Sequence, residues 1–133
     1  MERGLYVSII GGCHDCHTQG YREAAGKIDP AKAMKGDASI AWQSPSGVTY
    51  ASNLTLFAFI RDEDSFVQDM KDLPETLPPM PWYNVRAIQE NDLRSLYRYL
   101  ISLGDSGKPV PPASHEKPKT PYITIDPPTI PNN

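Results

Sequence analysis

Cysteine is scarce in this sequence, and long hydrophobic runs are absent from it. Cys13 and Cys16 are the only cysteines among 133 residues, and His14, His17 and His115 are the only histidines. Structural zinc usually takes four protein ligands, so this small supply disfavours a zinc domain. No apolar stretch approaches the ~20 residues of a membrane-spanning helix. The formal net charge of −3 offers no basis for nucleic-acid binding.

Both cysteines lie in one short motif, Cys13-His14-Asp15-Cys16-His17. Two cysteines separated by two residues and followed directly by histidine are the attachment signature of a c-type haem. If the segment is helical, residues i and i+3 share a face, so both sulfurs can reach the two vinyl groups on one edge of the porphyrin. The next side chain can then pass beneath the ring and bind the iron. The motif therefore predicts thioethers at Cys13 and Cys16, with His17 as the proximal ligand.

Other interpretations of the motif agree less well with the sequence. A thioredoxin-like dithiol opens a helix after a strand in a βαβ unit, and the chain before Cys13 does not supply one. A disulfide between Cys13 and Cys16 would close a very small loop and stabilise little. His14, inside the motif, is expected to be solvated and to bind no metal.

Several helices are predicted by the spacing of apolar residues. Residues 5–10 place apolar side chains at helical spacing and end at two glycines. Residues 29–36 have an N-cap acid, proline at the first helical position and glycine past the end, which predicts a short helix. Asp62 opens another short helix, which Pro74 stops. The longest pattern covers residues 90–103 and presents one apolar stripe.

A hairpin and a helix pair complete the predicted arrangement. Residues 39–42 and 48–51 alternate in polarity around Gln-Ser-Pro-Ser-Gly, which predicts a small hairpin. The first and last helices each have one apolar face. Packing these two helices against each other buries both faces and leaves the middle segments to surround the haem.

A stiff loop carries the candidate for the second axial ligand. Met80 lies in the segment Leu-Pro-Pro-Met-Pro-Trp-Tyr at residues 77–83, where prolines on both sides keep the backbone extended and remove donors. A thioether is a soft ligand suited to iron(II), and Met opposite His is the pairing that raises the potential of electron-transfer haems. Met34 and Met70 have core-like contexts. Met80 is therefore predicted to bind the iron, the alternative being an ordinary apolar loop residue.

Three segments, taken in order, resemble class I cytochromes c over residues 2–112: the Cys-His-Asp-Cys-His motif, the Pro-Pro-Met-Pro-Trp loop and the final helix. The glycine pair before the motif, residues 51–55 and residues 80–83 look like bacterial cytochromes that serve periplasmic dehydrogenases. The resemblance implies an all-α cytochrome c fold at residues 1–104. In it the N- and C-terminal helices pack together around one covalent haem c, and a proline-rich extended tail follows at residues 105–133.

The same resemblance implies the roles of particular residues. His17 and Met80 would be the axial ligands, and Tyr97 would pack between the terminal helices. The carbonyl of Pro30 would accept the Nδ1 proton of His17, a hydrogen bond that orients the ring and makes it a better donor.

The implied function is that of a single-electron carrier and not of an enzyme. It would pass electrons from a dehydrogenase to a downstream acceptor, with no nucleic acid and no membrane span in this chain. A haem protein with a labile sixth position, either a gas-binding sensor or a peroxidatic enzyme, is the alternative.

A periplasmic location is implied as well, because haem of this type is attached outside the cytoplasmic membrane in the cytochromes that the chain resembles. The first ten residues have too short an apolar stretch, and no cleavage signature, for a secretory signal. We therefore expect a mature or trimmed chain.

Two positions depart from the family pattern, and the end of the chain differs in composition. Gln19 stands where proline is common in the family. An apolar run at residues 56–59 replaces a polar turn, and this run is either part of the core or an exposed docking patch. Eight of the fourteen prolines lie in residues 109–131 and favour extended conformations. This tail either lies on the surface or is disordered, or it binds a partner through residues 122–125. His115 within it is expected to be solvated.

Overall fold

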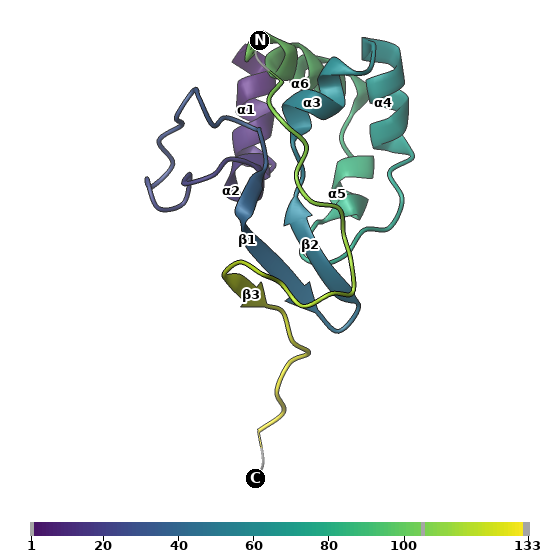
Figure 1. Cartoon of the computed structure of the whole chain (residues 1–133). Helices are drawn as coiled ribbons and strands as arrows, with labels where there is room; N and C mark the ends of the chain where they lie inside the picture. The colour runs from purple at the N-terminus through teal and green to yellow at the C-terminus, as the bar shows by residue number, and fades with distance from the viewer. Residues whose placement is uncertain (1, 105, 132–133) are drawn as a thin grey trace.

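Helices and a small sheet occupy different ends of the molecule (Figure 1). The computed structural model describes residues 2–104 and 106–131. The helices are α1 (Glu2–Ile10), α2 (Cys13–His17), α3 (Leu54–Phe59), α4 (Glu63–Lys71), α5 (Trp82–Arg86) and α6 (Glu90–Ser102). The strands are β1 (Asp37–Ser44), β2 (Gly47–Ala51) and β3 (Tyr122–Thr124). Met1, Asp105, Asn132 and Asn133, which belong to the expected domain and tail, lie outside the described residues.

The expectation of an all-α fold is wrong, because the described residues form a mixed α/β structure with a three-stranded sheet in the order β2-β1-β3. The predicted hairpin is confirmed, and β1 pairs with β2 in antiparallel fashion from Ser44↔Gly47 to Asp37↔Ala51. The third strand was not predicted. It comes from the proline-rich tail and pairs in parallel with β1 at Ala41↔Tyr122. Pairing between residues so far apart in sequence leaves no local periodicity to recognise.

The terminal helices pack against each other as expected, but α1 buries a different face from the predicted one. Its buried residues are Gly4 and Ser8, whereas Ile9 and Ile10 are exposed. At Gly4 an added Cβ would lie 2.1 Å from the Ser95 carbonyl oxygen of α6. Small side chains at i and i+4 therefore allow a close approach of the two helix backbones, and this approach decides which face is buried.

Gly4→Ala is expected to destabilise the fold by about 3 kcal/mol, because the new methyl group would also lie 2.6 Å from Tyr99 Cβ and force the helices apart. The gain in helix propensity, about 1 kcal/mol, offsets only part of this cost. Urea unfolding measures the difference, with Glu2→Ala on the exposed side of the same helix as control. Unchanged unfolding of Gly4→Ala would contradict the close packing of α1 and α6.

The core surrounds the apolar face of α6. Leu93, Leu96 and Leu100 are buried, and α1, α3 and α4 all pack against this helix. Helix α4 begins as predicted at Asp62, whose side chain accepts a hydrogen bond from Ser65 N at 2.7 Å. No helix in the described part of the chain is long and apolar enough to span a membrane.

The apolar run at residues 56–59 is divided between the two predicted environments. It forms most of α3, and the Phe57 side chain packs against the core. Phe59 and the following Ile60 are exposed. The side chains of Phe57 and Phe59 differ in environment because two residues of helix rotate a side chain by about 200°, to the opposite face.

The short helix predicted at residues 29–36 is not present, and the segment forms successive turns. Met34 adopts a left-handed backbone conformation with φ of +59°, which a helix interior excludes. Tertiary hydrogen bonds stabilise this arrangement. The Met34 N–H donates to Thr18 Oγ1 at 2.9 Å, and the Met34 carbonyl accepts from the N–H of Leu54 at 2.9 Å.

The proline-rich tail lies along both outer edges of the hairpin. After α6 the chain passes α3 and β2 and then returns beside β1 as β3 (Figure 1). Ser114 exchanges two backbone hydrogen bonds with Val48 on β2, at 2.7 and 2.9 Å, and Ile125 N donates to Gln43 O of β1 at 2.7 Å. The segment predicted to anchor a partner therefore pairs with the chain's own sheet, and the tail covers backbone groups that an open sheet edge would expose.

Candidate functional site

The two cysteines lie on a single turn of helix. Helix α2 follows Gly12, whose φ of +72° suits glycine and turns the chain out of α1. Cys13 and Cys16 are both free and half-buried, three positions apart on this turn. The structure thus confirms that the motif is helical, and residues at i and i+3 share one face of a helix.

The environment of the cysteines favours the neutral thiol. Burial raises the pKa of Cys13 to about 11. Burial also raises the pKa of Cys16, although the nearby Arg22 guanidinium opposes the shift. The unreacted thiols are therefore protonated, whereas a nucleophilic dithiol acts through the thiolate. An S–H group that adds across a vinyl double bond needs no such ionised resting state.

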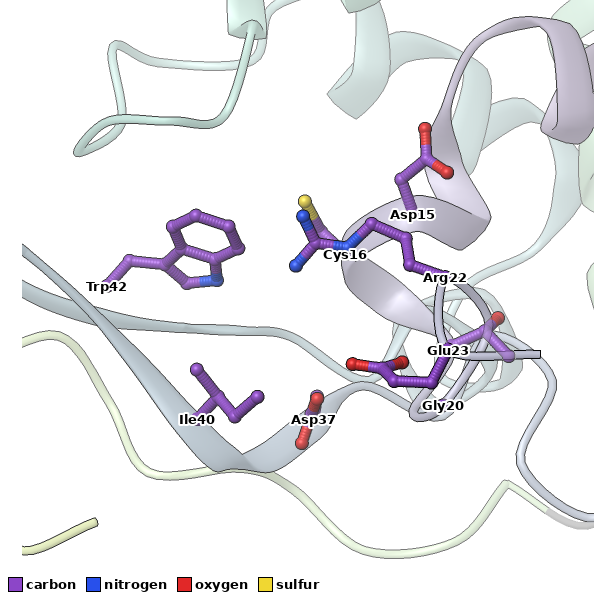
Figure 2. Close-up of a pocket in the computed structure, with 9 residues that line it drawn as sticks. Asp15, Cys16, Gly20, Arg22, Glu23, Asp37, Ile40 and Trp42 are labelled. Atoms are coloured by element: carbon purple, nitrogen blue, oxygen red, sulfur yellow. The ribbon is translucent and has the colours of Figure 1, made fainter. Parts of the chain in front are cut away.

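Cys16 borders a small polar pocket between α2 and β1. Figure 2 shows its sulfur near the guanidinium of Arg22, with the indole of Trp42 on the far side of the pocket. The Arg22 guanidinium carbon lies 5.6 Å from the centre of that ring, within cation–π range. Three carboxylates also line the pocket, those of Asp15, Glu23 and Asp37. The surroundings of α2 on this side are therefore mostly polar, in contrast to the side that packs against the core.

His17 is buried with one ring nitrogen engaged. Its side chain is 7% exposed, and Nδ1 donates to the carbonyl of Ser52 at 2.7 Å. Burial lowers the pKa of His17, against the opposing effect of the Ser52 hydrogen bond, so the ring is neutral. Neutral imidazole is the form that binds metal, and the engaged Nδ1 leaves Nε2 as the ligand atom.

The expected role of Pro30 is wrong, because Ser52 supplies the carbonyl that accepts from His17. Pro30 is exposed, in the turns before β1. The assignment to Pro30 depended on the family pattern, whereas the position of a main-chain carbonyl depends on the path of the loop. Residues 51–55 carried a sequence signal through their resemblance to bacterial cytochromes, but nothing in that signal specified a contact with His17.

His14 is fully buried, so the expectation of a solvated side chain is wrong. Its Nδ1 lies 2.7 Å from Thr18 Oγ1, and its Nε2 lies 3.1 Å from Ser8 Oγ and 3.3 Å from the Tyr99 hydroxyl. Tyr21 stacks on the ring with a centroid separation of 5.2 Å. Sequence reasoning missed this residue, because Tyr99 is far along the chain and no motif links the two.

The hydrogen-bond partners of His14 define its tautomer. Ser8 Oγ donates to the Leu5 carbonyl at 2.7 Å, so it accepts the Nε2 proton of His14. Nδ1 then accepts from the hydroxyl of Thr18. Burial lowers the pKa of His14, consistent with this neutral form. Both ring nitrogens are used within the protein, and the side chain connects α2 to α1 and α6.

Met80 is the described methionine that lies outside the core. Met34 and Met70 are 0% and 6% exposed and belong to the hydrophobic core, as expected from their sequence contexts. Met80 is half-buried in the loop before α5, where its carbonyl accepts from Trp82 N at 2.9 Å. Figure 1 shows α2 and α5 on opposite sides of the hairpin. His115 is exposed in the tail, as expected.

The residues present agree with the requirements of a covalently attached haem. Among residues 2–104 and 106–131, no three His, Cys, Asp or Glu side chains form a group that could hold a bare metal ion. Haem iron needs no such group, because the porphyrin provides four nitrogens and the protein adds one or two axial ligands. Helix α2 brings Cys13, Cys16 and His17 together, and Met80 is a soft sulfur in a separate loop.

Comparison with known proteins relates the chain to part of a much longer dehydrogenase polypeptide. It is 28% identical over 111 residues to a nicotinate dehydrogenase subunit of Pseudomonas putida. The aligned region covers 77% of this chain and 8% of that protein, so the chain spans less than a tenth of the relative's length. No family model matches the chain, and no solved structure matches it.

Proposed function

We propose that this chain is a single-electron carrier with one covalently attached haem c, acting as an electron-transfer component of a dehydrogenase system. The observation that carries the proposal is the geometry of α2. It places two neutral thiols on one helical turn, followed directly by a buried histidine whose Nδ1 bonds to Ser52 and whose Nε2 is left for iron. The bound haem would supply a reversible one-electron change between iron(II) and iron(III).

The protein's own residues would attach, orient and tune that group. Cys13 and Cys16 would form thioethers, which fix the position of the macrocycle relative to α2. The hydrogen bond from His17 to Ser52 sets the orientation of the imidazole ring and raises its donor strength. Met80, in its proline-bounded loop, would be the second axial ligand and favour iron(II). None of these roles requires bond chemistry on a substrate.

The partner would be a dehydrogenase that delivers electrons to this chain, with a downstream acceptor that removes them. Support comes from the similarity to a subunit of a nicotinate dehydrogenase, which favours a role in an oxidoreductase system. A periplasmic location belongs to the same proposal, because c-type haem attachment takes place outside the cytoplasmic membrane in the cytochromes that the sequence resembles.

Expression in a host with c-type maturation tests the proposal. We expect one haem per chain, reversible reduction and reoxidation by artificial one-electron carriers, and a low-spin spectrum that does not change with added cyanide or carbon monoxide. Rapid binding of carbon monoxide to the reduced protein would instead favour the alternative with a labile sixth position. A chain that carries no haem after expression in this host would contradict both the electron carrier and the haem protein with a labile sixth position.

A further inference from the structure

We infer that Asn53 is a positioning residue for His17, held in place by the first residues of the tail, and that this contact tunes the reduction potential. The inference rests on the proposed haem function. It assigns part of the control of the reduction potential to a segment outside the Cys-His-Asp-Cys-His motif and the Met80 loop. The residues of the tail involved, 106–108, are called the tail start below.

The first step concerns the acceptor of the His17 proton. The 2.7 Å bond from Nδ1 ends on the carbonyl of Ser52, which belongs to the peptide group that joins Ser52 to Asn53. The direction and length of this bond therefore depend on the orientation of that one peptide plane. A stronger bond gives the ring more anionic character and makes it a better donor to iron(III).

One side of this peptide group is packed against Gly36. The Gly36 N–H donates to the His17 carbonyl at 2.8 Å. A Cβ at position 36 would lie 2.6 Å from the Ala51 carbonyl oxygen, 2.8 Å from the Ser52 carbonyl carbon and 2.9 Å from Asn53 N. The backbones at residues 17, 36 and 51–53 thus meet at closest packing distance, so the peptide cannot shift toward Gly36.

The side chain of Asn53 fixes the same peptide group through hydrogen bonds to residues that come later in the chain. Asn53 is 5% exposed, and its Oδ1 accepts from Leu56 N at 3.0 Å and from the Thr55 hydroxyl at 2.6 Å. Its Nδ2 donates to the carbonyls of Ser106 at 2.6 Å and Lys108 at 2.9 Å. Two acceptor and two donor positions are the full capacity of an amide. A saturated buried amide has one favourable orientation, and it fixes the backbone that carries it.

The tail start therefore provides both acceptors for the amide protons of Asn53. Further along, the tail remains attached to the domain through Ser114 on β2 and through β3 on β1. Loss of the Asn53 contact should consequently loosen the tail start without releasing the whole tail. The expected consequence at His17 is a weaker hydrogen bond to Ser52, weaker donation to iron(III) and a higher reduction potential.

Asn53→Asp in the full-length chain tests this inference. Aspartate keeps the oxygen that accepts from Leu56 N and Thr55 but removes both donors to the tail start. We expect unchanged haem content and about tenfold faster exchange of the His17 Nδ1 proton, a factor that corresponds to about one hydrogen bond. The reduction potential is compared in the uncharged variant Thr55→Val, because a buried carboxylate by itself stabilises iron(III) and lowers the potential. The backbone amides of residues 106–108 and of Val110 should also exchange faster, whereas the other positions up to residue 112 are prolines without an N–H. Asn91→Asp, at an exposed position of α6, is the control with the same charge change.

Thr55→Val is a second variant that does not depend on a new charge. It removes the hydroxyl that donates to Asn53 Oδ1 at 2.6 Å and that also lies 3.1 Å from the Ser106 carbonyl oxygen of the tail start. Its loss should raise the reduction potential and accelerate exchange of the His17 Nδ1 proton by less than tenfold. Folded variants with the potential and exchange rates of the wild type would overturn the inference. A wild-type chain that takes up no haem would overturn the proposed function instead, so the two failures are distinguishable.

Discussion

Met80→Ala should open the distal side of the haem to water or cyanide and lower the reduction potential. A thioether stabilises iron(II) relative to iron(III), and its loop keeps solvent away from the metal, so its loss removes both effects. Axial ligands set haem potentials over a range of ~0.8 V, and we expect a fall on the order of 0.1 V or more. The weak red absorption of sulfur-ligated ferric haem should disappear. Redox titration and the oxidised spectrum measure these changes.

Met70→Leu is the matched control for this prediction. Its side chain is 6% exposed in the core on α4, and a swap that conserves volume should cost under ~1.5 kcal/mol. The potential and the red band should therefore stay close to the wild-type values. A Met80→Ala protein that keeps the sulfur band, or a Met70→Leu protein that loses it, would show that Met80 is not the ligand.

Removal of the two thiols should abolish covalent haem attachment. In the wild type the haem should remain with the chain through acid-acetone extraction. The double variant Cys13→Ser, Cys16→Ser should release all of it, because no other cysteine exists to form a thioether. Each single variant should retain one thioether at lower yield. Mass spectrometry of the peptide that contains residues 13–17 distinguishes these outcomes.

Complete extraction of haem from the properly matured wild type would contradict the attachment prediction, whatever the spectrum. Asp15→Asn offers a control within the same turn of helix, since it alters charge but neither sulfur. It should leave the haem attached. Loss of attachment in this control would show that the maturation machinery fails to recognise an altered motif, and not that a missing cysteine sulfur prevents thioether formation.

The sequence by itself determined the features that arise from neighbouring residues. The spacing of Cys13 and Cys16 predicts that both lie on one helical face, with His17 about a third of a turn further round, and α2 has that helix. The acid cap at Asp62 and the apolar stripe of α6 are equally local, and the structure confirms both. Local spacing succeeds in these cases because the hydrogen bonds and side-chain contacts involved lie within one or two helical turns.

Only the tertiary structure decided which residues support the candidate site. Ser52 accepts from His17 across 35 positions of sequence, and His14 contacts Tyr99 across 85. The strand β3 pairs with β1 from the far end of the chain and makes the fold mixed instead of all-α. Each contact joins backbone groups or side chains whose proximity depends on the packing of whole elements, and residue spacing carries no record of that packing.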